Sequence, residues 1–524
     1  MSVWHKWGLA AALTALAIAY SIAFRAPAVG AFHDDGVYIV TAKALAEGKG
    51  YRIISLPSEI PQTKYPALFP ILLAAVWKWN PNFPENVPLL KLIPLLSTLL
   101  WLGLSYRLLR EEDLPAPVAA WICCLTAAST WVVYLGTMVL SEAPFAALTT
   151  ASLLAFRRAE RRASTRLLTV SAICAALAFH TRTLGLAWIL AGALYLALGR
   201  RWRQALLFAA VAAILAAPWI WWVASQPQPA GAVDAYYSKE NYQGWNILSN
   251  FTLSEKFTIL LSNLTMLLFA PGLLAGIPAK GWLALGALAV GTATVAGLWK
   301  QRSGVFTLLF LVYGGIVCAW AWIPSRFVVP FLPLILWHAW HSLENHPRVR
   351  RSAMALITIT AAISLTVGLE ATLRLGYPPL PTPAANTDGW DRQEALLREI
   401  RRQTPPNAIL LGNLDPLYYL YTGRKAVRGF AAKPFPLFYS HQPAESADSP
   451  IGGPAQLLQS IHASGATYWV DTPNSAFAEG PHLQRILHQL QQRYPTAFFP
   501  AAVIADSHTL YQLRLKSQAL PAEQ

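Results

Sequence analysis

The sequence predicts a polytopic α-helical membrane protein with a small α/β domain at its C-terminus. Composition supports this fold class, because 55% of the 524 residues are hydrophobic and only 13% are charged, whereas ordinary soluble domains have about 25% charged residues. The apolar residues also gather in long runs. A bilayer is crossed by about 20 consecutive apolar residues of helix, so we expect about 11 spans together with interfacial helices.

The first apolar run follows Lys6 and resembles a signal peptide, but no convincing small-residue cleavage site follows it, so we expect an uncleaved span. The run 66–79 has only 14 residues and contains prolines, so we place it along the outer interface. Residues 250–278, interrupted by two prolines, are expected to form an outer-face or re-entrant stretch. The expected spans are 7–24, 88–109, 116–136, 143–158, 165–180, 183–199, 203–224, 281–299, 304–322, 327–343 and 351–371.

Positive charge orients these spans. The net charge of +15 comes mainly from basic residues in short connections, where they set topology rather than bind nucleic acid. With a cytoplasmic N-terminus, all of these clusters fall on the cytoplasmic side, and counting 66–79 as a span would reverse them. They lie at 107–110, 157–166, 200–203, 300–302 and 348–351. An odd number of spans then places the C-terminus outside.

The chain changes character near residue 376, where prolines form a linker. We therefore divide it into a membrane domain, 1–375, and an outer domain, 376–524. Periodicity and breaker residues in the outer domain predict helices over 390–403, 415–421, 454–463 and 482–493, strands over 408–411 and 467–470, and one or two strands within 501–513. Gly423 is expected to close the second of these helices in a left-handed conformation.

Candidate functional residues gather on the outer face of this topology. They are the acids Asp34, Asp35 and Glu142, the bases Lys64, Arg182 and Arg326, and His180. A carboxylate whose pKa is raised by a neighbouring acid and by burial can act as a base, while Lys and Arg stabilise a phosphate. The set therefore suits a reaction in which a base takes a proton from an acceptor and cations hold an anionic leaving group, such as the phosphate of a polyprenyl-linked sugar.

Each residue also has a structural interpretation. The acidic pair could belong to a solvated loop, and Lys64 and Arg326 could simply reach lipid headgroups, as bases at helix ends often do. Glu142 could cap a span. His180 is most simply a hydrogen-bonded residue between helices. The four cysteines lie inside apolar runs without metal-ligand spacing and are expected to be core residues.

The order of the motifs around these residues resembles that of bacterial GT-C glycosyltransferases of the protein mannosyltransferase and aminoarabinose transferase type (glycosyltransferase family 39-like). The resemblance covers roughly residues 8–345 and rests on Asp-Asp-Gly-Val-Tyr, Lys-Tyr-Pro, Ser-Glu-Ala-Pro, Arg-Thr-Leu-Gly and Arg-Phe-Val-Val-Pro-Phe-Leu-Pro in that order. It implies a GT-C-like, multi-pass enzyme of the bacterial inner membrane with a periplasmic C-terminal domain. Such an enzyme would be an inverting glycosyltransferase that moves a sugar from a polyprenyl-phosphate carrier to an extracytoplasmic lipid, glycan or protein.

The resemblance also implies roles. It implies that Asp34 is the catalytic base, with Asp35 as its neighbour or alternate, and that Lys64 contacts the carrier phosphate. It also suggests that Glu142 binds the acceptor or a cation. Arg326, with Arg182 and His180, completes the candidate substrate-binding set. Thr63 stands where aminoarabinose transferases have a glutamate before the lysine, which argues against that substrate and leaves the need for a divalent cation open.

Two other classes of protein remain as alternatives. A transporter or lipid flippase would also place charges beside a membrane cavity, but it usually has internal repeats and charges near the middle of its spans. No internal repeat is visible in this sequence. A non-catalytic membrane scaffold with a partner-binding outer domain is the third possibility.

Overall fold

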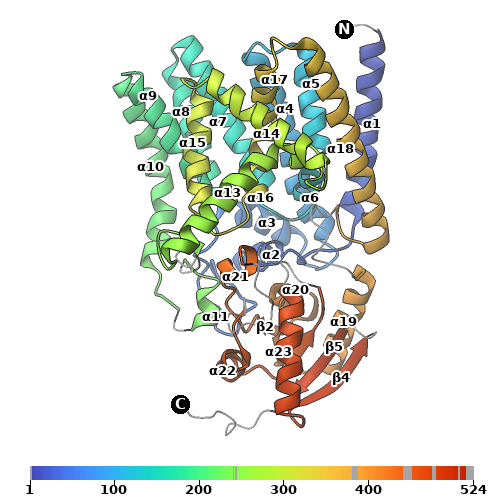
Figure 1. Cartoon of the computed structure of the whole chain (residues 1–524). Helices are drawn as coiled ribbons and strands as arrows, with labels where there is room; N and C mark the ends of the chain where they lie inside the picture. The colour runs from blue at the N-terminus through green and yellow to red at the C-terminus, as the bar shows by residue number, and fades with distance from the viewer. Residues whose placement is uncertain are drawn as a thin grey trace.

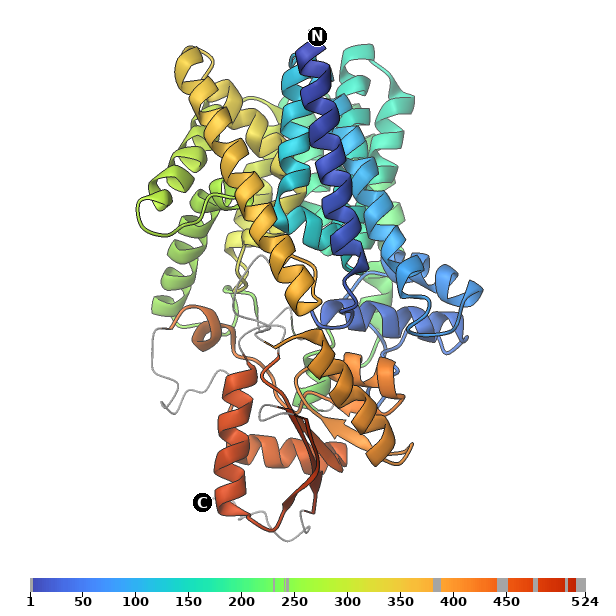
Figure 2. The same ribbon diagram turned by 90° about the vertical axis from the view of Figure 1, so that its right-hand side faces the viewer.

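The computed structural model describes residues 3–229, 231–239, 241, 245–379, 388–440, 451–474, 479–504 and 508–514. A long bundle of helices forms one end of the molecule and a small sheet domain forms the other (Figure 1). Figure 2 shows that the N-terminus lies at the end of the bundle that is far from the sheet. The predicted proline linker lies largely outside the described residues, because 380–387 are not among them.

The helices of the bundle follow the predicted apolar runs. Among the described residues, six helices are long and apolar enough to cross a membrane, or seven if α5 and α6, which are bent by 67°, form one span. The predicted count of eleven spans is therefore not confirmed. The bundle comprises α1 (Val3–Arg25), α4 (Val87–Glu111), α5 (Ala116–Ala128), α6 (Thr130–Thr137), α7 (Glu142–Arg162), α8 (Thr165–Thr181), α9 (Leu186–Leu198), α10 (Trp202–Ser225), α13 (Leu253–Leu274), α14 (Leu283–Lys300), α15 (Val305–Cys318), α17 (Leu332–Ser342) and α18 (Pro347–Leu375).

The stretch 250–278, predicted to be outer-face or re-entrant, contains one long helix. Its helix α13 is apolar and 22 residues long, with a proline inside it, and it enters the bundle obliquely (Figure 1). A Cβ atom at Gly276, just after α13, would lie 2.8 Å from Cα of Ala361, the middle of α18. Neither the outer-face nor the re-entrant placement is confirmed, because α13 is one of the six helices that are long and apolar enough to cross a membrane. A small-residue surface of α13 fits against α14, with Gly272 meeting Ala287.

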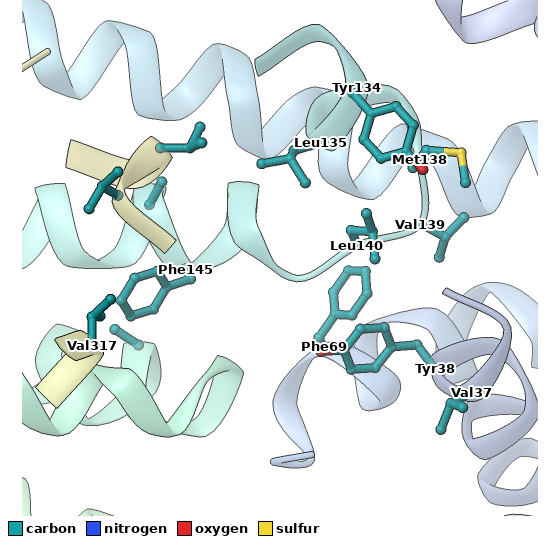
Figure 3. Packing of buried hydrophobic residues seen from close by; sticks show 14 of the residues in the cluster. Val37, Tyr38, Phe69, Tyr134, Leu135, Met138, Val139, Leu140, Phe145 and Val317 are labelled. Carbon is teal, nitrogen blue, oxygen red and sulfur yellow. The ribbon is translucent and has the colours of Figure 1, made fainter. Parts of the chain in front are cut away.

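Two short helices, α2 (Asp34–Ala46) and α3 (Leu68–Trp79), lie between the bundle and the sheet domain (Figure 1). The position of α3 agrees with the predicted interfacial helix. Figure 3 shows how these helices pack: the rings of Tyr38 and Phe69 meet edge to face at 5.1 Å, beside Leu140. This apolar packing fixes α2, and with it the acidic pair, against the end of the bundle.

The outer domain is built on a five-stranded sheet with the order β2-β1-β3-β5-β4. The strands are β1 (Ile409–Leu411), β2 (Lys425–Val427), β3 (Tyr468–Asp471), β4 (Phe498–Ile504) and β5 (His508–Leu513), and the helices are α19 (Trp390–Gln403), α20 (Asp415–Thr422), α21 (Pro434–Phe438), α22 (Pro454–Ser464) and α23 (Gly480–Arg493). β1, β2 and β3 pair in parallel, and β5 pairs antiparallel with β3 and β4. The predicted elements are all present within a few residues, and Gly423 ends α20 in the left-handed conformation. β2 and α21 were not predicted.

Candidate active site

The acidic pair lies on a closed turn at the start of α2. The carboxylate of Asp35 accepts hydrogen bonds from the backbone N–H groups of Gly30 at 2.6 Å and Phe32 at 3.1 Å, so its side chain ties the turn together. Burial raises the pKa of Asp35 to about 7, although these backbone hydrogen bonds oppose the shift. Asp35 is fully buried and is not among the residues that line the adjacent pocket.

Asp34 faces the other way, into the pocket. Its Oδ2 atom accepts a hydrogen bond from Nη2 of Arg326 at 2.7 Å, and its Oδ1 atom accepts one from the hydroxyl of Tyr65 at 2.6 Å. Burial raises the pKa of Asp34, but the charges of Arg326 and Lys64 and these hydrogen bonds outweigh burial and hold the pKa well below its usual range. The expectation of a raised pKa was therefore wrong for Asp34. The positive charges of Arg326 and Lys64 lower its pKa by more than burial raises it.

A chain of ion pairs extends from Asp34 across the pocket. Glu142, at the first turn of α7, lies with Oε1 2.8 Å from Nε of Arg326 and 2.7 Å from Nη1 of Arg182. Arg326 belongs to the short helix α16 (Ser325–Val328), and Arg182 directly follows α8. Four candidates from four separate segments thus alternate in charge as Asp34, Arg326, Glu142 and Arg182.

Lys64 reaches the same pocket from the loop before α3. The side chain of Gln62 accepts the backbone N–H groups of Lys64 at 2.9 Å and Tyr65 at 3.3 Å, which fixes the direction of this loop. The Lys64 ammonium lies 4.1 Å from the centroid of the Tyr236 ring. Burial lowers the pKa of Lys64 to about 8, although Asp34 opposes the shift. Taking an ammonium out of water beside other cations is costly, so this arrangement favours binding of an anion.

The pocket has an empty volume of about 1060 Å³, counted out to its open mouth. Asp34, Lys64, Arg182 and Arg326 form its polar wall. Most of the remaining lining is apolar or aromatic, and it includes Leu184, Leu186, Ile316, Val317, Trp245, Trp320 and Trp322. Leu186 is 44% exposed on the outer surface of the bundle, so the apolar wall leads towards the surface that faces lipid in a membrane.

Two of the predicted residues lie elsewhere. His180 donates a hydrogen bond from Nε2 to the carbonyl of Leu215 in α10 at 2.7 Å and does not line the pocket, which agrees with its structural interpretation. Asp35 supports the turn. Within the described ranges, no group of three or more His, Cys, Asp and Glu side chains is arranged to hold a metal ion. Asp34, which lines the pocket, and Glu142, which lies behind the lining arginines, are both paired with arginine, so these residues do not fit a cation site.

Sequence reasoning missed five residues that surround the site. Tyr65 is the middle residue of the Lys-Tyr-Pro motif and had no role assigned from the sequence, although its hydroxyl donates a hydrogen bond to Asp34. The others are His33, Tyr236, Asp415 and Arg428, which come together from three distant parts of the chain. Among these four residues, only His33 could have been suspected from the sequence, because it directly precedes the acidic pair.

No protein-family model matches this chain, and no curated protein matches it. Solved structures do. ArnT from Cupriavidus metallidurans in the apo state is 12% identical and aligns over 97% of this chain and 98% of its own, with a TM-score of 0.57. The same protein bound to undecaprenyl phosphate is 12% identical over 99% of each chain, with a TM-score of 0.56.

The oligosaccharyltransferase AglB from Archaeoglobus fulgidus, in complex with an inhibitory peptide and a dolichol-phosphate, is 14% identical over 99% of this chain and 75% of its own, with a TM-score of 0.49. The likeness to ArnT extends over nearly the whole length of both chains. The predicted GT-C resemblance is therefore confirmed at the level of fold.

Proposed function

We propose that this protein is an inverting glycosyltransferase that moves a sugar from a polyprenyl-phosphate carrier to an acceptor outside the cytoplasm. The observation that carries the proposal is the pocket itself, where the Asp34 carboxylate lies beside Lys64 and Arg326 at the end of an apolar wall. The two cations can bind the phosphate of a lipid carrier, and the carboxylate can take a proton from the acceptor. The likeness in fold to ArnT, which has been solved with undecaprenyl phosphate, supports the same donor class.

In this mechanism Asp34 takes the proton from an acceptor hydroxyl as the acceptor oxygen attacks the anomeric carbon. The attack comes from the face opposite the phosphate, so the configuration at that carbon inverts. The bond between the anomeric carbon and the phosphate oxygen breaks, and its electron pair remains on the phosphate. Lys64 and Arg326 stabilise the negative charge that develops there, and the proton on Asp34 then leaves to solvent.

The ion pairs of the empty pocket couple base strength to donor binding. In the empty pocket, the charges of Arg326 and Lys64 hold the pKa of Asp34 low. A bound phosphate competes for the same two cations, which weakens their hold on the carboxylate and raises its affinity for a proton. Asp34 therefore becomes a stronger base when the donor is in place. Glu142 keeps a contact with Arg326 at 2.8 Å and orients that side chain during the exchange.

The remaining walls suit the other parts of the donor. Leu184, Leu186, Ile316 and Val317 offer apolar surface to the first isoprene units, and Leu186 is exposed enough to give the tail a path to the bilayer. The tryptophans of the lining offer flat faces to a sugar ring. We assign the end of the molecule that carries the sheet domain to the periplasm and the N-terminus to the cytoplasm, because the basic connections lie at the N-terminal end of the bundle.

The direct test is transfer by the purified protein in detergent. Polyprenyl phosphates carrying different radiolabelled sugars are offered with membrane lipids, glycans and peptides as acceptors, and the anomeric configuration of donor and product is compared by NMR. We expect transfer with inversion from one donor, and its loss in Asp34→Asn but not in Asp113→Asn, a matched change at an exposed aspartate far from the pocket. Absence of transfer to every acceptor class, with movement of labelled carrier between the leaflets of proteoliposomes, would instead support a flippase.

A further inference from the structure

The sheet domain packs directly against the turn that carries Asp34. Ala28 and Ala31, just before the acidic pair, are buried in one apolar cluster with Leu417 of α20. A Cβ atom at Gly36 would lie 2.8 Å from Cβ of Pro416, in the first turn of α20. The N-terminal turns of α2 and α20 therefore touch with no room for a methyl group between them.

His33 is the buried link between this turn and the sheet domain. Its Nε2 atom lies 3.3 Å from Oδ1 of Asp415 and 3.2 Å from the hydroxyl of Tyr237, and the side chains of His33 and Asp415 are 0% exposed. His33 has a φ of 69°, a conformation that is strained for a non-glycine residue and persists only where the surroundings enforce it. Because Asp34 is the next residue, the contacts of His33 determine where the Asp34 carboxylate points.

A second buried contact reaches the cationic side of the pocket. Arg428 follows β2, is 1% exposed, and pairs through Nη2 with Glu479 at 2.7 Å. Its guanidinium carbon lies 4.5 Å from the centroid of the Tyr236 ring, the same ring that lies 4.1 Å from the Lys64 ammonium. Cation–π contacts are stronger when the partners are shielded from water, as the buried Arg428 and Lys64 are. The ring of Tyr236 thus contacts two cations, Lys64 from the membrane domain and Arg428 from the sheet domain.

We propose that Asp415 and Arg428 of the sheet domain are positioning residues for transfer, Asp415 acting on Asp34 through His33 and Arg428 acting on Lys64 through Tyr236. The sheet domain is then a wall of the active site and not a separable binding module. The chemistry in this inference rests on the proposed function, whereas the fixing of the turn does not. The two parts are therefore measured separately.

The experiment uses the full chain in detergent and two variants with matched controls. Asp415→Asn is compared with Asp391→Asn, an exposed acid in the first turn of α19, and Arg428→Gln with Arg398→Gln, an exposed arginine of the same helix. Hydrogen exchange of the amides of residues 30–37 is measured by mass spectrometry. In parallel, kcat and the KM for the donor are measured on the same variants. The amides of Gly30 and Phe32 report the turn, because they donate to Asp35.

Asp415→Asn should speed amide exchange over residues 30–37 by about tenfold and lower kcat by about tenfold while KM changes by less than about twofold, because the turn loosens but the phosphate site remains. Arg428→Gln should instead raise the KM for the donor about fivefold. The effect of the double variant His33→Asn/Asp415→Asn should be smaller than the sum of the two single effects, because both changes break the contact between His33 and Asp415. A general loss of stability would not lower kcat in one variant and raise KM in the other, and it would not make the effects of His33→Asn and Asp415→Asn non-additive.

Unchanged exchange over residues 30–37 in a folded Asp415→Asn variant would overturn the inference, whether or not a sugar donor has been found. Unchanged kcat in that variant, with an active wild-type protein, would also overturn it while leaving the proposed function intact. An inactive wild-type protein would count against the proposed function alone, since the exchange measurement still decides the fixing of the turn. If Asp415→Asn does not fold, Tyr237→Phe removes only the hydroxyl next to His33 and is judged by the same exchange criterion.

Discussion

Replacing Asp34 by asparagine should separate donor binding from transfer. The substitution keeps the size of the side chain and removes its charge and its basicity. General-base catalysis contributes about 10²–10⁴-fold to rate, so transfer should fall by at least about 100-fold. The protein should stay folded, because Arg326 retains its ion pair with Glu142 at 2.8 Å and is not left without a counter-ion.

Carrier binding should change in the opposite direction. In the wild-type protein the Asp34 carboxylate occupies Nη2 of Arg326 at 2.7 Å and attracts Lys64, so an incoming phosphate must compete with it. A hydrogen bond to a charged group is worth about 1.5–3 kcal/mol. If removing the competing charge recovers about 1 kcal/mol of this, undecaprenyl phosphate should bind about fivefold more tightly.

The assay combines equilibrium binding of undecaprenyl phosphate with radiolabel transfer, using wild-type protein, Asp34→Asn and the Asp113→Asn control. Tighter binding together with lost transfer is the expected signature. Weaker binding in Asp34→Asn would refute the competition between carboxylate and phosphate. Transfer within about tenfold of wild type, less than a general base contributes, would remove Asp34 from the mechanism altogether.

Three further changes test neighbouring contacts. Lys64→Met should raise the KM for the donor by at least about tenfold, because a charge-assisted contact to phosphate is lost, and an unchanged KM would exclude Lys64 from phosphate binding. Tyr65→Phe removes a hydrogen bond that lowers the pKa of the base, so the acidic limb of the kcat/KM profile should move to higher pH; a limb that stays in place would contradict this contact. Gly36→Ala should cost about 1–3 kcal/mol of stability through overpacking against Pro416. Gly103→Ala, inside α4 where a Cβ meets nothing within 4 Å, should not lower the melting temperature, because alanine favours a helix more than glycine does.

The helical bundle and most of the outer domain could be predicted because apolar runs and breaker residues are local signals. The pocket could be predicted in part for a different reason. Alternation of spans, oriented by basic connections, placed Asp34, Lys64, Glu142, Arg182 and Arg326 on one face, and the structure brings these five together. The side of the membrane on which each residue lies could thus be predicted from the alternation of spans alone.

Other features depend on contacts that no local pattern records. The depth of α13 is set by the close fit of small residues such as Gly272 against another helix. The direction of the pKa shift of Asp34 depends on Arg326, which lies 292 residues away in the chain. His33 and Asp415 are separated by 382 residues, so the packing of the sheet domain on the acidic turn could not be inferred from either segment alone.

The two carboxylates of the acidic pair show why adjacent, identical residues need separate arguments. Asp35 accepts backbone N–H groups and holds a turn, whereas Asp34 contacts the side chains of Arg326 and Tyr65 in the pocket. A buried carboxylate flanked by cations is a poor base until another anion shares those cations. In the proposed mechanism, the charge arrangement that weakens Asp34 in the empty pocket is therefore the same one that prepares it for a phosphate-linked donor, and it would suppress proton abstraction until the donor is bound.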